Sequence, residues 1–70
     1  MNSPCMEMRV SWVICDNDGD LFEGTTEECK AWLDGYHSLI EGVSTRYADD
    51  DLDKAADAGM EYAKSHGALI

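Results

Sequence analysis

In the stretch RVSWVICDNDGDLFEGTTEECKAWL, residues 9–33, the spacing of hydrophobic residues changes from that of a strand to that of a helix. The first part is rich in β-branched and aromatic residues and is interrupted by the turn sequence DNDG at 16–19. This combination predicts a β-hairpin over residues 8–24. Asn17 and Asp18 suit a type I turn, and Gly19 suits the positive φ that follows such a turn.

The register of this hairpin follows from its turn. We expect Asp16 to pair with Asp20, which places Ile14 opposite Phe22. The face that packs on the core then consists of Val10, Trp12, Ile14 and Phe22. The other face is not cleanly polar, so another strand or a partner is expected to cover part of it; its residues are Ser11, Val13, Cys15, Leu21 and Glu23.

The second part of the stretch opens a helix that we expect to span residues 26–42. Thr25 or Thr26 can serve as its N-cap, and Glu28 follows Thr25 at the spacing of a capping box. Gly35 is expected inside this helix on its polar side, although it could also end the helix early. The apolar residues recur every three or four positions: Cys29, Trp32, Leu33, Tyr36, Leu39, Ile40 and Val43.

A second helix is expected over residues 50–66, with Asp49 or Asp50 as its N-cap. Its apolar stripe is built mainly of small residues, which allows close approach to the first helix and to the hairpin. The stripe consists of Leu52, Ala56, Gly59, Met60 and Ala63. Gly67 is expected to end the helix, and residues 68–70 can add a short edge strand or fray.

These elements predict a single α+β domain over residues 1–70, in which an N-terminal β-hairpin packs on two α-helices (ββαα). Residues 1–7 are expected to form a flexible leader. Seventy residues allow one small core, and a hydrophobic fraction of 44% is sufficient to fold it.

The chain carries 15 acidic and 5 basic residues, a net charge of −10. Asp50, Asp53, Asp57 and Glu61 follow one another at spacings of three, four and four, so on a helix they share one face, next to Asp49 at its start. Like charges at this spacing weaken a helix. A row of carboxylates can stand in for nucleic-acid phosphates in a Lys/Arg-lined channel, and the alternative is an ordinary solvated face.

A second acidic cluster surrounds the hairpin turn and contains Asp16, Asp18, Asp20 and Glu23. The sequence DNDGD suggests an EF-hand calcium loop. With Gly19 in the sixth position, however, Ile14 is first and Thr25 is twelfth, so the required ligands are missing. The cluster is therefore interpreted as turn chemistry and as a second part of the partner-binding surface, and no metal site is predicted.

Cysteine and histidine are too few and too far apart to indicate a zinc site or a nucleophile with its base. We expect no enzymatic activity, no catalytic residues and no cofactor. The three cysteines, Cys5, Cys15 and Cys29, cannot all pair within the chain, and the N-terminus lacks the features of a secretory signal. No apolar run approaches the ~20 residues of a membrane span. We expect a cytoplasmic monomer that binds neither membranes nor nucleic acid directly.

The small size, the acidity and the acidic stretches DNDGD (16–20) and ADDDLDKAADAGMEY (48–62) resemble the small phage and mobile-element proteins that inhibit bacterial defence, notably anti-CRISPR proteins that act as DNA mimics. The resemblance lies in size and charge, and no functional residue is carried over by a motif. It implies a non-catalytic inhibitor, in the cytoplasm of a bacterial host, that docks on the DNA- or PAM-binding surface of a CRISPR effector complex.

Two other functional classes fit the same residues. One is an acidic antitoxin or immunity protein that covers the basic active site of a toxic nuclease. The other is an accessory phage protein whose charge serves only solubility. For the inhibitor of a defence complex and for the antitoxin or immunity protein, the partner is a basic nucleic-acid-binding protein or complex.

Overall fold

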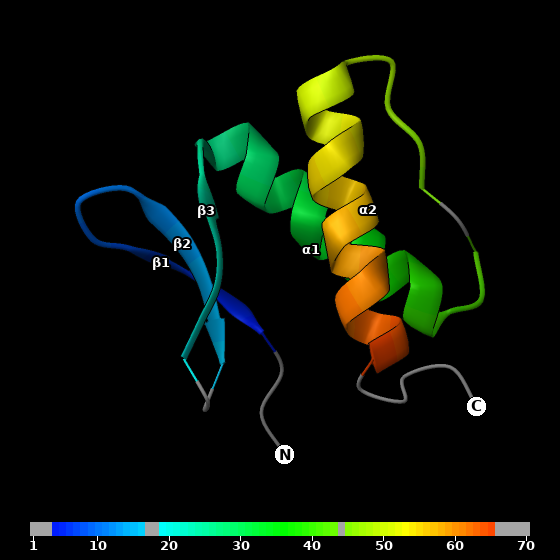
Figure 1. Ribbon diagram of the computed structural model, residues 1–70, viewed down its shortest axis with the longest axis horizontal. Helices are drawn as coiled ribbons and strands as arrows, with labels where there is room; N and C mark the ends of the chain where they lie inside the picture. Colours follow the sequence, from blue (N-terminus) through cyan, green and yellow to red (C-terminus); the bar gives the residue numbers. More distant parts are fainter. Residues whose placement is uncertain (1–3, 17–18, 44, 66–70) are drawn as a thin grey trace.

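The computed structural model describes residues 4–16, 19–43 and 45–65. In chain order its elements are β1 (Cys5–Met8), β2 (Trp12–Asp16), β3 (Gly19–Gly24), α1 (Thr26–Ile40) and α2 (Asp50–Ser65). Figure 1 shows the strands gathered on one side and the helices, which cross one another, on the other. The predicted α+β arrangement of strands followed by helices is confirmed, with one more strand than expected.

The additional strand, β1, pairs antiparallel with β2, and in the described part of the chain the sheet has the order β1-β2-β3. The prediction of a flexible leader over residues 1–7 is therefore wrong from residue 5 onward. Met6 lies opposite Ile14 and packs against the core, and this contact fixes the strand. Residues 9–11 form the turn between β1 and β2, and Val10 at this turn is fully exposed rather than part of the core.

The β2–β3 hairpin has the expected pairing at its centre and an irregularity near its turn. Ile14 lies opposite Phe22 as predicted, but Asp16 pairs with Gly19 instead of Asp20. The register shifts between Ile14 and Cys15, which leaves Leu21 as the extra residue of a β-bulge. Because the bulge interrupts the alternation of side chains, Leu21 packs against the core together with Phe22 and not on the outer face.

Gly19 has a φ of 135°, as its place after the turn requires. The turn residues themselves, 17 and 18, lie outside the described residues.

Helix α1 begins with the predicted capping box. The Glu28 amide donates to the Thr25 hydroxyl, and the Thr25 amide donates to the Glu28 carboxylate. The helix ends at Ile40, two residues earlier than predicted, because Gly42 adopts a φ of 86°. The Gly42 amide then donates to Leu39 and the Val43 amide to Ser38, the pattern of a Schellman cap. Ile40 and Val43, at the end of the predicted apolar stripe, are consequently exposed.

Helix α2 begins at Asp50, as predicted, with Asp49 in the capping position, and its described part ends at Ser65. Residue 66, the expected terminator Gly67 and the possible strand at 68–70 lie outside the described residues.

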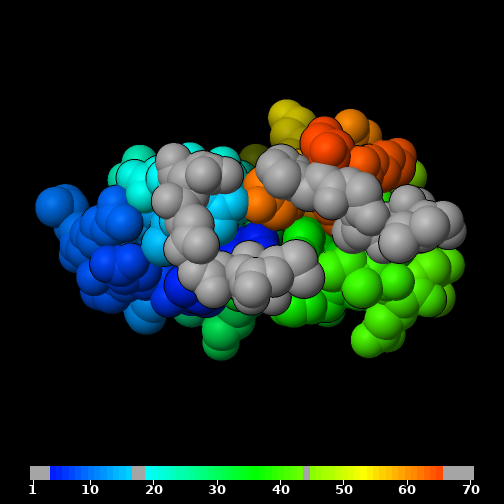
Figure 2. Space-filling view, turned by 90° about the horizontal axis from the view of Figure 1, so that it is seen from below, coloured from blue at the N-terminus to red at the C-terminus, as the bar shows by residue number. Residues whose placement is uncertain are grey.

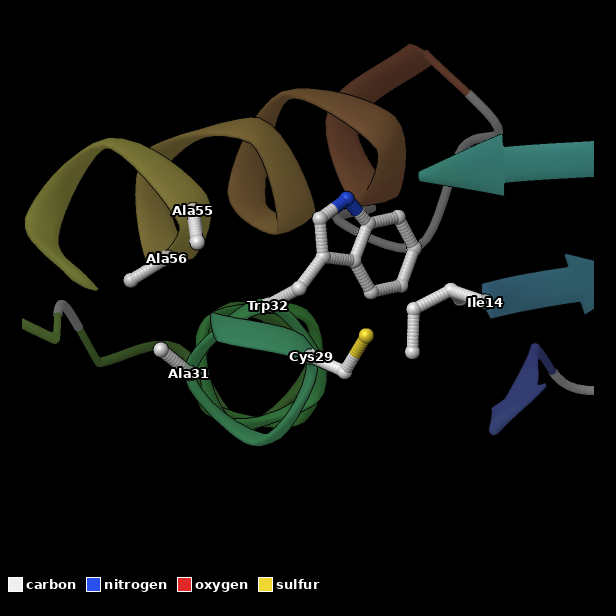
Figure 3. Close-up of a cluster of buried hydrophobic side chains, with 6 residues drawn as sticks. All are labelled: Ile14, Cys29, Ala31, Trp32, Ala55 and Ala56. Atoms are coloured by element: carbon white, nitrogen blue, oxygen red, sulfur yellow. The ribbon is translucent and has the colours of Figure 1, made fainter. Parts of the chain in front are cut away.

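The core centres on Trp32, whose side chain is 2% exposed. Figure 3 shows its indole ring between α2 and the strands, with Cys29 and Ile14 on the sheet side and Ala55 and Ala56 on the helix side. Tyr36 stacks on this ring at 5.8 Å and Tyr62 tilts against it at 5.4 Å between ring centroids. Trp32 is thus a core residue as expected, whereas Trp12 is only half-buried.

The two helices touch backbone to backbone through glycine. A methyl group on Gly35 would overlap the Ala56 carbonyl, and a methyl group on Gly59 would overlap the Trp32 carbonyl. The expectation that Gly35 lies on the polar side of its helix is therefore wrong: Gly35 is buried where α1 crosses α2. The predicted small-residue stripe of α2 does face α1, with Ala56, Gly59 and Ala63 buried.

The molecule is flat. Its Cα atoms span 35 × 32 × 13 Å. Figure 2 shows one narrow edge, with β1 and β2 at one end and the last part of α1, in green, at the other.

Gly59→Ala is expected to lower the free energy of unfolding although alanine favours helix by about 1 kcal/mol. The added methyl group meets backbone, which moves only if the helices separate, so we expect a net loss of roughly 1 to 3 kcal/mol by urea denaturation. Asp57→Ala, at an exposed position of the same helix, is the control and should leave the midpoint nearly unchanged. Equal or greater stability of the Gly59 variant would refute the close helix contact.

Candidate acidic binding surface

Helix α2 presents its acidic side to solvent. Ala55, Ala56, Gly59, Met60 and Ala63 are buried on one side. At 100° per residue, the opposite side of the helix carries Asp50 and the residues four, seven and eleven positions after it, all of which are exposed. We call the exposed carboxylates on this side the α2 acidic face; its members are Asp50, Asp57 and Glu61.

Basic residues interrupt this face. Lys54 is exposed on the same side of the helix, and Lys64 lies 3.6 Å from the Glu61 carboxylate. Both side chains of the Glu61–Lys64 pair are more than half exposed, so water and salt screen their attraction and the pair adds little stability.

Asp53, the fourth member of the predicted row, has a different role. Its side chain is half-buried on the flank of α2, where one oxygen accepts the Tyr47 amide at 3.1 Å. The other oxygen lies 3.7 Å from the Arg46 guanidinium. Asp53 therefore holds the segment that leads into α2. It faces the protein's own backbone, whereas Asp50, Asp57 and Glu61 face solvent.

Asp49 is also engaged within the fold. Its carboxylate accepts the amides of Asp51 and Leu52 at 2.9 and 3.1 Å, as an N-cap does. Asp50, the alternative cap in the sequence, is the first residue of the helix itself.

A shallow concavity of about 280 Å³ lies where α1 and α2 begin. We call it the acidic concavity; its lining residues are Thr25, Glu27, Glu28, Asp49, Asp51 and Leu52. Glu28 and Asp49 are occupied as caps, which leaves Glu27 and Asp51 as exposed carboxylates on the two helices. Sequence reasoning did not connect Glu27, Glu28 and Asp51 with the row on α2. Both caps were visible in the sequence, but their proximity depends on the helix crossing.

The carboxylates near the hairpin turn form a separate group. Asp16 accepts a hydrogen bond from the Tyr62 hydroxyl, which ties the end of β2 to α2. Both oxygens of Asp20 accept from Arg9 at 2.9 Å, and Glu23 accepts from the Ser11 hydroxyl. Asp18 lies outside the described residues. The three described carboxylates are thus held by intramolecular hydrogen bonds and belong to the sheet rather than to the α2 acidic face.

The outer face of the sheet, on the side away from the helices, carries a polar network. Glu7 accepts from the Cys15 thiol at 3.3 Å and from Arg9 at 3.5 Å. These two donors, the thiol first, lower the pKa of the Glu7 carboxyl below its usual value. The same carboxylate and Asp20 raise the pKa of Arg9. Val13 is only 4% exposed on this face and pairs with Glu7 and Glu23 on its two neighbouring strands.

Comparison with protein-family models, with curated proteins and with solved structures gives no match. Among residues 4–16, 19–43 and 45–65, His, Cys, Asp and Glu side chains form no cluster that could hold a metal ion. In the same ranges, no helix combines the length and the apolar character needed to cross a membrane.

Asp49→Ala should destabilise the fold by about 1 kcal/mol because two amides at the start of α2 lose their acceptor. Asp50→Ala is the matched control, since it removes the neighbouring charge and leaves the cap in place. We expect thermal melting followed by circular dichroism to show a clear loss for Asp49→Ala and a smaller one for Asp50→Ala. The reverse order would assign the cap to Asp50.

Tyr47 provides a pH-dependent test of the segment before α2. Burial, and then donation of its hydroxyl to Asp34 at 2.7 Å, raise the pKa of Tyr47 to about 12. In the unfolded chain a tyrosine loses its proton near pH ~10, so this contribution to stability is complete below that pH. It is lost as the pH rises through the folded pKa of about 12.

Tyr47→Phe removes this titration. Urea midpoints measured between about pH 9 and about pH 11.5 should therefore fall less steeply for the variant than for the parent chain. All other residues are the same in both proteins, so their contributions cancel in the comparison. Parallel curves would show that the Tyr47 hydroxyl is not held as described.

Proposed function

We propose that this protein is a non-catalytic inhibitor that occupies the basic nucleic-acid-binding surface of a bacterial defence complex, as the anti-CRISPR DNA mimics that it resembles do. One observation carries the proposal. The carboxylates of Asp50, Asp57 and Glu61 lie along α2 opposite its buried side, and Glu27 and Asp51 add exposed charge where α1 and α2 begin. The proposed inhibitor acts as a monomer in the host cytoplasm.

The electrostatic argument favours a basic partner. From Asp50 to Glu61 the face extends roughly 16 Å at 1.5 Å per residue, long enough to meet several Lys or Arg side chains. In the free protein, like charges along this row repel one another. In a basic channel the same charges form charge-assisted hydrogen bonds and displace the ions that otherwise accompany the partner. The net charge of −10 also speeds encounter with a positive surface.

In the described part of the chain, other carboxylates form hydrogen bonds within the fold, whereas some on α2 do not. The proposal can therefore be tested by replacing carboxylates that the fold does not need. Asp49 and Asp53 hold the start of α2 and the segment before it, and Asp16 and Asp20 hold the sheet. Asp57 and Glu61 are exposed in the middle and latter part of α2, so their replacement changes the surface and leaves these contacts in place.

The double substitution Asp57→Lys/Glu61→Lys should abolish inhibition while the chain stays folded, because each lysine removes an attraction and adds a repulsion. The assay is plating of a CRISPR-targeted phage on bacteria that express the chain, with one strain for each CRISPR type. We expect the parent chain to restore plating in at least one strain and the double variant to fail there. Circular dichroism and equal expression confirm that the variant is intact.

The control is Val10→Lys/Glu41→Lys/Val43→Lys, which changes the net charge by the same amount at exposed positions of the β1–β2 turn and the end of α1. It should retain inhibition. Duplex DNA should compete with the chain for binding to the purified CRISPR effector complex. The affinity of the chain for that complex should fall steeply from about 50 to about 200 mM salt. Equal loss in the double variant and in the control would mean that only total charge matters. Simultaneous occupancy by DNA and the chain, without mutual cost, would refute mimicry.

A further inference from the structure

Two of the three cysteines face each other across neighbouring strands. Cys5 of β1 and Cys15 of β2 are direct partners in the antiparallel register. Such partners have Cα atoms roughly 4.5 or 5.5 Å apart, depending on the hydrogen-bonding position, and a disulfide needs about 4.4 to 6.8 Å. Their side chains lie on the same face of the sheet, and the Cys5 side chain is within hydrogen-bonding reach of the Cys15 thiol. The pairing therefore meets the backbone spacing that a disulfide requires.

The two thiols differ in access. Cys5 is exposed at the edge strand, whereas Cys15 is buried in the central strand. The remaining cysteine, Cys29, is fully buried in the core, where it packs with Ile14. Because Ile14 and Cys15 are consecutive in a strand, their side chains point to opposite faces, so the sheet separates Cys29 from the Cys5–Cys15 pair.

We propose that Cys5 and Cys15 form a reversible cross-strand disulfide, in which Cys5 reacts first with a small-molecule disulfide such as oxidised glutathione and Cys15 resolves the adduct. In the first step the Cys5 thiolate attacks the small disulfide, forms a mixed disulfide and releases one thiolate. In the second step the Cys15 thiolate attacks the Cys5 sulfur, forms the Cys5–Cys15 bond and releases the second thiolate. Two protein thiols are oxidised, one small disulfide is reduced to two thiols, and the protons pass to those products.

The groups around Cys15 determine the rate of the second step, the attack of Cys15 on the Cys5 sulfur. Cys15 donates to the Glu7 carboxylate, pairs with Cys5 on β1 and lies opposite Asp20 on β3. The hydrogen bond to Glu7, followed by burial and the neighbouring Cys5, raises the pKa of Cys15 to about 11. At neutral pH little Cys15 is present as thiolate. The pair therefore remains a dithiol in a reducing environment and closes once Cys5 has been modified.

Closure would link β1 covalently to the sheet and would remove the Cys15 hydrogen atom that Glu7 accepts. The carboxylate of Glu7 would then be left with Arg9 as its partner on this face. Oxidation is thus expected to fix the N-terminal strand and to rearrange the polar network above Val13.

The test treats the full reduced chain with oxidised glutathione, blocks remaining thiols with an alkylating reagent and digests it after glutamate under non-reducing conditions. Cleavage after Glu7, Glu23 and Glu28 places each cysteine in a separate peptide. We expect a chain about 2 Da lighter than the reduced one, with the Cys5 and Cys15 peptides joined and Cys29 unmodified until the chain is unfolded.

Variants assign the two roles. Cys15→Ser should accumulate the glutathione adduct on Cys5, and Cys5→Ser should form neither the adduct nor the cross-link. Cys29→Ala is the control and should form the cross-link as the parent chain does. In concentrated urea, where the register is lost, pairings that involve Cys29 should appear as well.

The rate of closure reports on Cys15 itself. In the parent chain it should rise about tenfold per pH unit between about pH 7 and 9, because the thiolate fraction rises in this way below the pKa. Glu7→Gln should speed closure at pH ~7 several-fold, since it removes the carboxylate that holds the thiol proton. A persistent Cys5 adduct in the parent chain, a folded-state cross-link to Cys29, or closure independent of pH would overturn the proposal.

Discussion

The contact on which the rest of this structure depends is the backbone crossing of α1 and α2. Gly35 lies against Ala56 and Gly59 lies against Trp32, with no room for a side chain at either glycine. This approach closes the apolar space around the Trp32 ring, which Ile14 and Cys29 close from the sheet side. The same crossing brings the starts of the two helices together as the acidic concavity and turns Asp50, Asp57 and Glu61 outward. Core and surface charge therefore follow from one geometric constraint.

Local patterns in the sequence were sufficient for most of the fold. The capping box at Thr25, the start of α2 and the pairing of Ile14 with Phe22 each depend on neighbouring residues, and each was predicted. Strand β1 was missed because CMEM is only four residues long and becomes a strand only by pairing with β2, four to ten positions further along the chain. The bulge at Leu21 was missed as well. It reflects a competition between turn closure and the burial of Leu21 and Phe22, and the spacing of hydrophobic residues in the sequence does not show its outcome.

The candidate site was predictable in its spacing but not in its division of roles. Helical geometry alone places Asp50, Asp57 and Glu61 on one exposed side. The sequence does not reveal that Asp53 is bound to Tyr47 and Arg46, because that depends on the path of the segment between the helices. The same reason applies to Glu27 and Asp51, which approach each other only in the folded chain. The sequence shows on which side of a helix a carboxylate lies. Tertiary contacts decide whether that carboxylate is occupied within the fold or exposed to a partner.

The flatness of the molecule has an electrostatic consequence. Its thinnest dimension, 13 Å between outermost Cα atoms, is longer than the distance of ~8 to 10 Å over which physiological salt screens a charge. At physiological salt, carboxylates on one broad side are therefore largely screened from a cation that approaches the other. At an ionic strength of ~0.01 M the screening distance grows to ~30 Å, and the whole net charge of −10 then acts on an approaching cation together. The attraction to a positive surface is therefore governed by the nearest carboxylates at physiological salt and by the total charge at low salt.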